Sequence, residues 1–442
     1  PAVAVTAFTR IASANSRRAI CKEPELEEKV WHNITTIHNL LEFQPEFFYD
    51  SEKDKDSMRF VPMRNAGNPL TVKTIIFEEA SMIDLSLWEK IYDAMLSGTQ
   101  CIFVGDINQL PPVFGPSILN YALVQLPIVE LSTVYRQAFG SSVLKNAHHI
   151  LNGETIEWDE DFKIIEGGKT QLGQSAIAHL LSGSVRKWFS NGEYNPETDI
   201  FLTPFNKQPL GSDSINNHIA QIITPEETEV WEIIAGIRKM YLAVGDKVLW
   251  NKQVGIVTKI ARNGLYMGKP CKPPSAHLSR FGHMIHNGEE EDLEDEEDSS
   301  LMDVPAFDLE KMEKEDLEEL SRQSSHIVDI HLLDTGQTVV ISKVGDFSKQ
   351  SLSLAYALTV HKSQGCEWRK VFVLLHKDHS IMAFNELLYT AVTRASEKVV
   401  IIGKKFMVEK AIATRRIKGN GIREKIEFFN ANMTLTGVSC TK

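Results

Sequence analysis

The chain has 442 residues, enough for about two to four compact domains. Apolar residues make up 43% of it, and no apolar run approaches the ~20 residues of a membrane-spanning helix, so a membrane partner is not expected. The first residues, PAVAVTAFTRIASANSRR, lack the layout of a signal peptide. Five scattered cysteines form no CxxC pair, which argues against a cysteine-rich zinc site. They favour a reducing compartment such as the cytoplasm of a bacterial or phage-infected cell, or the nucleus.

The net charge of −12 is unevenly distributed. Residues 288–319 contain seventeen acidic residues and two lysines, a net charge of −15, which leaves the remainder of the chain at +3. The remainder is therefore mildly basic, and one acidic insertion hides it. The insertion is too polar to bury a core, and we expect a disordered loop. A solvated loop is the favoured interpretation, and the alternatives are a docking site for a protein partner or an electrostatic mimic of nucleic acid.

The N-terminal residues predict a strand over 3–6, followed by a loop that enters a helix. Thr9 near the helix start could donate a hydrogen bond to a phosphate, and Phe8 could stack on a base. The alternative is an ordinary strand–turn–helix unit with a buried phenylalanine. The later stretch TTIHNLL places the hydroxyl of Thr36 and the imidazole of His38 where both can reach a phosphate.

Residues 43–70 predict a β-hairpin insertion. Aromatic residues, including Phe47 and Phe48, flank a polar turn over 50–57. The hairpin could be functional or merely decorative, and the sequence pattern favours neither.

Residues 74–113 predict a strand–helix–strand unit. The runs 74–77 and 101–104 have the composition of buried parallel strands, and residues 85–96 repeat apolar side chains at helical spacing. Ligands of open α/β sheets bind at the carboxyl ends of such strands. Four polar side chains are expected there: Glu78, Glu79, Asp106 and Gln109.

Consecutive carboxylates after a buried strand suit a divalent metal ion, because such ions prefer oxygen ligands. The neighbouring carboxylate is then left to orient a water molecule. The alternative is two solvated acids at a strand end. The stretch GDINQLPPV, which follows the second strand, favours the metal site.

FEEAS and GDINQLPPV resemble motifs II and III of superfamily 1 helicases, and TTIHNLL resembles a signature of the RecD/Dda-like branch. The resemblance covers islands in family order over about residues 3–403. It implies α/β architecture: two RecA-like parallel-sheet domains with ATP and Mg²⁺ in the cleft between them. It further implies that Glu79 activates water and that Gln109 senses the γ-phosphate. Glu78 replaces the usual metal-side Asp, a change that moves the carboxylate by ~1.5 Å.

Later islands carry two arginines. VELSTVYRQ, expected to be a strand, resembles motif IV, and the resemblance places its Arg136 facing the γ-phosphate. ELLYTAVTRASEKVVIIG resembles motif VI, with Arg394 as an arginine finger, a role worth ~10³–10⁵ in rate. The alternative for Arg394 is a structural ion pair.

Two further segments predict nucleic-acid or nucleotide contacts. In IFLTPFNKQPLGSDSINNHI, Asn206 could meet nucleic acid, although turn chemistry explains it equally well. LTVHKSQGCEWRK resembles motif V, with a strand-to-helix turn near a phosphate. Its candidates for DNA are Thr359, His361 and Lys362, and its candidates for the nucleotide are Gly365 and Glu367.

Residues 241–350 contain several short strands between polar turns, which suggests a small barrel, and the family carries an SH3-like insertion at this point. The expected domains are 1–138 (first RecA-like domain, with 43–70 as a pin that splits duplex DNA), 139–240 with 351–442 (second RecA-like domain), and 241–350 (SH3-like insertion containing 288–319).

The sequence thus predicts an ATP-dependent DNA helicase that moves 5′ to 3′ on single-stranded and forked DNA. A phosphate loop of the form GxxGxGK[S/T] is absent from these residues, and we expect it to precede Pro1. One rival is a metal-dependent nuclease, which does not explain Arg136, Arg394 or the motif order. The other rival is an ATPase-deficient helicase fold that serves as a DNA-binding or assembly subunit.

Overall fold

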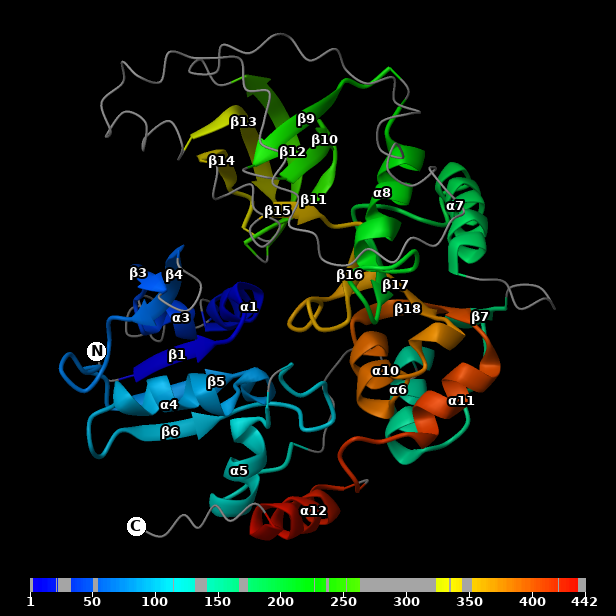
Figure 1. Ribbon diagram of the computed structural model, residues 1–442. Helices are drawn as coiled ribbons and strands as arrows, with labels where there is room; N and C mark the ends of the chain where they lie inside the picture. Colours follow the sequence, from blue (N-terminus) through cyan, green and yellow to red (C-terminus); the bar gives the residue numbers. More distant parts are fainter. Residues whose placement is uncertain are drawn as a thin grey trace, which may run out of the picture. The chain divides into compact units, whose positions relative to one another are not determined.

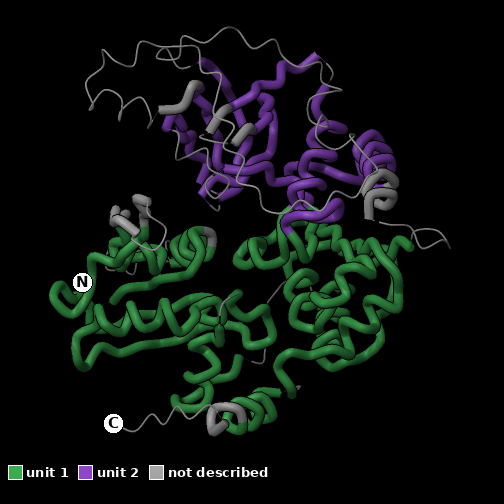
Figure 2. Tube along the Cα trace, viewed as in Figure 1, with its two compact units in different colours: residues 1–171, 201–205, 358–442 green, residues 172–200, 206–357 purple. Residues whose placement is uncertain are grey.

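The computed structural model describes residues 3–20, 22, 33–50, 55–113, 115–131, 141–166, 174–225, 227–235, 238–251, 253–262, 323–333, 335–343, 352–419 and 421–435. The chain divides into two compact units, residues 1–171, 201–205 and 358–442, and residues 172–200 and 206–357 (Figure 2). Among the described residues, none of the helices is long and apolar enough to cross a membrane.

The first parallel sheet has the strand order β2-β1-β5-β6. Its strands are β1 (Val3–Ala7), β2 (Ile34–Thr36), β5 (Thr74–Glu78) and β6 (Gln100–Phe103). The connecting helices are α1 (Arg10–Ile20), α3 (Ile37–Leu40), the 3₁₀ turn η2 (Ala80–Met82), α4 (Leu85–Asp93) and α5 (Ile118–Gln125). Parallel pairing brings the carboxyl ends of β1, β5 and β6 to one edge, as the sequence predicts.

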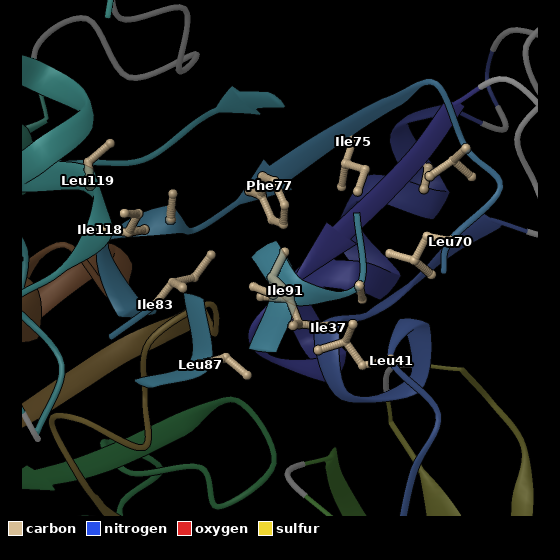
Figure 3. Packing of buried hydrophobic residues seen from close by; sticks show 14 residues of the cluster. Ile37, Leu41, Leu70, Ile75, Phe77, Ile83, Leu87, Ile91, Ile118 and Leu119 are labelled. Carbon is tan, nitrogen blue, oxygen red and sulfur yellow. The ribbon is translucent and has the colours of Figure 1, made fainter. Parts of the chain in front are cut away.

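The core of this sheet forms because β5 and α4 bury matching apolar faces. Ile75 and Phe77 are fully buried, and α4 packs Leu87 and Ile91 into the same cluster (Figure 3). Asp84 starts α4 by accepting a hydrogen bond from the backbone N–H of Leu87 at 2.7 Å. Each fully buried side chain of this size contributes about 1.5–3 kcal/mol. The sheet edge therefore rests on a well-packed layer.

The second parallel sheet has the order β16-β8-β17-β18-β7. Its strands are β7 (Phe162–Ile165), β8 (Asp199–Thr203), β16 (Ala357–Thr359), β17 (Trp368–Leu375) and β18 (Ala395–Gly403). Helices of this region are α6 (Ser142–Asn152), the 3₁₀ turn η5 (Lys377–His379), α10 (Asn385–Val392) and α11 (Lys405–Ala413) (Figure 1). The later helix α12 (Ile422–Leu435) lies beside α5 instead. The predicted α/β class with two parallel sheets is confirmed.

One predicted strand is wrong in its described part. Residues 129–131, the start of VELSTVYRQ, have no strand structure. Val129 and Leu131 are 84% and 87% exposed, so this apolar run has no sheet to bury it. Arg136 lies outside the described residues.

The predicted hairpin is present in the backbone as β3 (Phe43–Asp50) paired antiparallel with β4 (Lys55–Pro62). In its register Phe47 faces Met58 across the ladder. The role of the hairpin as a pin stays a prediction.

The described part of the unit of residues 172–200 and 206–357 contains helices and an antiparallel sheet of order β14-β13-β12-β11-β15, with a separate ribbon β10-β9. Its helices are α7 (Gln174–Ser190) and α8 (Ser212–Ile223). Its strands are β9 (Val230–Ala235), β10 (Arg238–Ala243), β11 (Lys247–Trp250), β12 (Gln253–Arg262), β13 (Gln323–Leu332), β14 (Thr338–Lys343) and β15 (Leu352–Leu354). The predicted short strands are therefore present, whereas the acidic segment 288–319 lies outside the described residues. The SH3-like barrel and the domain boundaries stay predictions.

Candidate active site

The turn after β5 carries both predicted carboxylates. Glu78 is the last residue of the strand, and Glu79 adopts the left-handed conformation, with φ 51° and ψ 44°. A non-glycine residue in this region costs about 1–3 kcal/mol and needs support from its surroundings. The backbone supplies it: the N–H of Ala80 donates to the carbonyl of Val104 at 2.9 Å.

Gly105 allows the turns after β5 and β6 to approach each other closely. A Cβ atom at Gly105 would lie 3.2 Å from the backbone nitrogens of Ala80 and Ser81. This separation is tighter than ordinary van der Waals contact. The glycine of GDINQ therefore brings Asp106 beside Glu79.

The carboxylates lie in a field that disfavours their ionised forms. Burial raises the pKa of Glu78, and the charge of Glu79 raises it further. Burial also raises the pKa of Glu79; Arg394 opposes this shift and Asp106 adds to it. Because the like charges are close and partly desolvated, a bound cation would stabilise their ionised forms.

The residues present fit a Mg²⁺ ion shared with a nucleotide. Among the described residues there is no cluster of three or more His, Cys, Asp or Glu side chains that could hold a metal alone. Mg²⁺ usually takes one or two protein carboxylates and completes its shell with phosphate oxygens and water. Glu78 and its neighbours supply that smaller donor set.

Three side chains from the second half of the chain anchor the loop of residues 106–110. The hydroxyl of Tyr389 donates to Asp106 Oδ2 at 3.0 Å. The N–H of Leu110 donates to Thr390 Oγ1 at 2.9 Å, and Gln364 Nε2 donates to the carbonyl of Leu110 at 3.0 Å. The loop is therefore fixed by residues more than 250 positions later in the sequence.

Gln109, inside this loop, has a buried Oε1 with no hydrogen-bond partner among the described residues. An unsatisfied buried oxygen costs about 1–3 kcal/mol unless a ligand or water pairs with it. The position agrees with a ligand-sensing role, which stays a prediction.

Arg394 follows α10 and is only 6% exposed. Its Nε donates to the carbonyl of Thr390 at 3.2 Å, and its Nη1 donates to the carbonyl of Cys366 at 3.2 Å. These bonds hold the guanidinium in place, and its charge acts on Glu79. The structure thus brings Arg394 into the same electrostatic environment as the predicted water-activating carboxylate.

The motif V turn meets the start of α1. Gly365 has a φ of +82°, and a Cβ atom there would lie 2.9 Å from Thr9 Oγ1. Asn15 Nδ2 donates to the carbonyl of Gly365 at 3.3 Å. In this structure, Gly365 therefore allows the motif V turn to approach Thr9 of the protein. Glu367, its predicted partner at the nucleotide, is exposed.

The predicted DNA-contacting hydroxyls of Thr9 and Thr36 act as helix caps, whereas that of Thr359 caps a turn, because no helix follows β16 where the sequence predicted one. Thr9 Oγ1 accepts from the N–H of Ala12 at 3.1 Å, and Thr36 Oγ1 accepts from the N–H of Asn39 at 3.2 Å. Thr359 Oγ1 likewise accepts from the N–H of Lys362 at 3.3 Å. A capping hydroxyl can still donate its own hydrogen, so this role is compatible with a phosphate contact.

Phe8 and His38 lie together. Their ring centroids are 5.8 Å apart in an edge-on arrangement, and His38 is 5.0 Å from Phe43 at the base of the hairpin. His361 is half-buried, and burial lowers its pKa, with a further contribution from Arg416. His38 is thus held by ring contacts with its neighbours, and His361 lies in a partly desolvated position.

The remaining predicted residues are placed as follows. Lys362 is exposed on the motif V turn. Asn206 belongs to the other compact unit, where its Oδ1 accepts from Ser212 Oγ at 3.3 Å, as turn chemistry predicts. For Phe47 and Phe48 the structure gives the backbone position only.

Sequence reasoning missed Gln364, Thr390 and Lys425. All three are buried polar residues, and each donates to or accepts from the 106–110 loop or its flank. Gln364 and Thr390 stand inside the quoted motifs, but nothing in their spacing indicates which partner they meet. Lys425 has no sequence signal.

Two known families match parts of the chain: the AAA domain over residues 2–115 and the UvrD-like helicase C-terminal domain over residues 354–402. The chain is 26% identical over 391 residues to the ATP-dependent RecD2 DNA helicase of Deinococcus radiodurans, covering 88% of this chain and 43% of that protein. It is 38% identical over 439 residues to the RecBCD enzyme subunit RecD of Mycobacterium tuberculosis, covering 97% of this chain and 65% of that protein. The chain therefore spans less than two thirds of these relatives. A solved Pif1 helicase structure from Bacteroides aligns with 17% identity over 98% of this chain and 94% of that chain, with a TM-score of 0.48.

Proposed function

Since this chain is homologous to the RecD-like helicases of superfamily 1, we propose that it is the motor region of an ATP-dependent DNA helicase. The observation that carries the proposal is that Glu79, the 106–110 loop and Arg394 come together at one edge of the first sheet. Phosphoryl transfer needs a carboxylate that orients water and a cation that stabilises developing charge. Glu79 and Arg394 have the chemistry for these two roles.

In this proposal, Glu78 would hold Mg²⁺, whose charge would offset that of the phosphate groups of ATP. Glu79 accepts a proton from the attacking water. Its raised pKa suits this task, because a general base works best when its pKa lies near the working pH. Gln109 Nε2 would donate to the γ-phosphate, and its Oε1, which has no partner among the described residues, would accept from the attacking water.

Single-stranded DNA is the proposed track, and forked DNA is the proposed substrate. The capping hydroxyls of Thr9, Thr36 and Thr359 each retain a hydrogen that can be donated to a phosphate. The paired rings of Phe8 and His38 offer a surface for stacking. Movement in the 5′ to 3′ direction rests on resemblance to the RecD/Dda-like branch, and a protein partner at residues 288–319 rests on charge alone.

The test is steady-state ATP hydrolysis by the natural protein with and without single-stranded DNA. We expect DNA-stimulated turnover, and a loss of ~10³-fold or more in Arg394→Ala, because this residue would stabilise the transition state. Arg369→Ala is the matched control, since Arg369 lies on β17 and pairs with Glu397 at a partly exposed position.

Equal stimulated rates in wild type and Arg394→Ala would refute the arginine-finger assignment. DNA binding by wild type without any hydrolysis of ATP would instead support the ATPase-deficient subunit.

A further inference from the structure

The last described helix, α12, packs on the first parallel-sheet region, although it follows the last strand of the second sheet in sequence. The helix α12 lies beside α5 (Figure 1). Phe429 of α12 and Ile417 form a buried cluster with Leu123 of α5. Gly419, with φ +111°, lies in the link before α12. The C-terminal segment therefore crosses back to α5, which follows the 106–110 loop in the sequence.

The link that precedes α12 is itself fixed to α10. The carboxylate of Glu386 accepts from the backbone N–H of Arg416 at 3.1 Å and from that of Ile417 at 2.9 Å. The guanidinium of Arg416 lies 4.0 Å from the ring centroid of Phe384. Because α10 also carries Tyr389 and Thr390, one helix holds both the loop and the start of this segment.

Lys425 connects α12 directly to the loop. It is 3% exposed, and its Nζ donates to Asn108 Oδ1 and lies 3.5 Å from the carbonyl of Ile107. Burial lowers the pKa of Lys425 to about 8; Glu386 and Asp106 oppose this shift, and Arg415 adds to it. A lysine is rarely buried without a specific partner. The partner here is the loop that contains Gln109.

We propose that α12 is a strap and that Lys425 is a positioning residue, which holds residues 106–110 in the geometry needed for nucleotide turnover. The idea rests on the proposed function. Tyr389, Thr390 and Gln364 hold the two ends of the loop, and Lys425 holds its middle, next to Gln109. Without Lys425 the loop keeps its ends but loses the contact that fixes Asn108. Turnover then falls while nucleotide and DNA binding are retained.

The main test compares Lys425→Met with wild type in the natural protein. Met retains the apolar stem of lysine and removes the donor. We expect kcat for ATP to fall about 10- to 100-fold with little change in KM, because small misplacements of reacting groups cost rate more than binding. Arg423→Met, at an exposed position of the same helix, is the matched control.

Hydrogen exchange supplies a readout that does not depend on ATP hydrolysis. Lys425→Met is expected to speed exchange at the N–H groups of Asn108 and Gln109, while β5 and β17 stay as protected as in wild type. Asn108→Ala removes the same contact from the other side and should reproduce the effect. The double variant should then be no worse than either single variant.

These outcomes separate the two proposals. Wild type without DNA-stimulated ATPase defeats the proposed function, and the exchange experiment still tests the strap. Wild-type kcat and wild-type exchange in Lys425→Met would overturn the strap. If Lys425→Met does not fold, Asn108→Ala serves as the test instead. Normal kcat and normal hydrogen exchange in Asn108→Ala would then overturn the strap proposal.

Discussion

The 106–110 loop and the β3–β4 hairpin both project from the first parallel-sheet region, but they are held in different ways. The loop is fixed by Gln364, Tyr389, Thr390 and Lys425, all far away in the sequence. The hairpin is fixed by pairing between neighbouring strands, with an exposed ion pair of 2.6 Å between Glu46 and Arg59. Such surface ion pairs contribute at most about 1 kcal/mol. The loop is therefore coupled to the second sheet region, whereas the backbone pairing of the hairpin is between its own two strands.

Substitutions in the hairpin give the strongest test of the difference between these two regions, because they should affect unwinding and ATP hydrolysis unequally. In Phe47→Ala/Phe48→Ala, we expect unwinding of duplexes with a 5′ tail to fall about tenfold or more, because base stacking on an aromatic ring is worth ~1–3 kcal/mol. DNA-stimulated ATPase should stay within about twofold, because the two strands of the hairpin pair with each other and the loop is held by other residues. Strand-displacement and ATPase assays on the same preparations measure both.

Tyr92→Ala is the matched control, because Tyr92 is an aromatic residue on α4 with 68% exposure. A parallel fall in unwinding and ATPase would mean that the hairpin is only part of the fold. Efficient unwinding of duplexes that carry only a 3′ tail would contradict the proposed polarity.

A substitution at Gly105 tests whether the 106–110 loop depends on close contact between the turns that follow β5 and β6. Gly105→Ala places a methyl group 3.1–3.2 Å from Leu119, Ala80 and Ser81, and backbone atoms cannot give way cheaply. We expect a loss of about 1–3 kcal/mol in stability, measured as a lower midpoint of thermal unfolding, together with slower ATP turnover.

Gly183→Ala is the control for this substitution. Gly183 lies in α7 with nothing within 4 Å of the added Cβ, so alanine should stabilise the protein slightly. An unchanged midpoint in Gly105→Ala would show that the two turns are not held in close contact.

The smallest effect is expected from Glu79→Gln measured as stability against pH. The pKa of Glu79 is raised in the folded state, so the folded protein binds more protons than the unfolded chain between the unfolded and folded pKa values. Ionisation of Glu79 therefore lowers stability as pH rises through this window. The variant should match wild type in acid and exceed it near neutral pH, by on the order of 1 kcal/mol or less.

Thermal unfolding at a series of pH values checks this expectation, with Glu89→Gln on the exposed side of α4 as the control. A variant less stable than wild type at neutral pH would mean that the attraction between Glu79 and Arg394 outweighs the burial of the carboxylate.

The sequence by itself determined the helices and strands around the site and the parallel direction of the two strands. Apolar runs of strand length at 74–77 and 101–104, with helical spacing between them, predicted β5, α4 and β6. The chemistry of FEEAS and GDINQ followed from the same pattern, because parallel strands place their carboxyl ends at one edge. These predictions depend on local periodicity, which a sequence displays directly.

Only the tertiary structure decided which distant residues complete the site. The left-handed backbone of Glu79, the close approach at Gly105 and the donors Gln364 and Lys425 arise from packing between segments up to about 320 residues apart. The same reason explains the error at 129–131, where the pattern looked like a strand but Val129 and Leu131 are exposed. Local patterns specify secondary structure, whereas burial and long-range hydrogen bonds decide which of its polar groups meet.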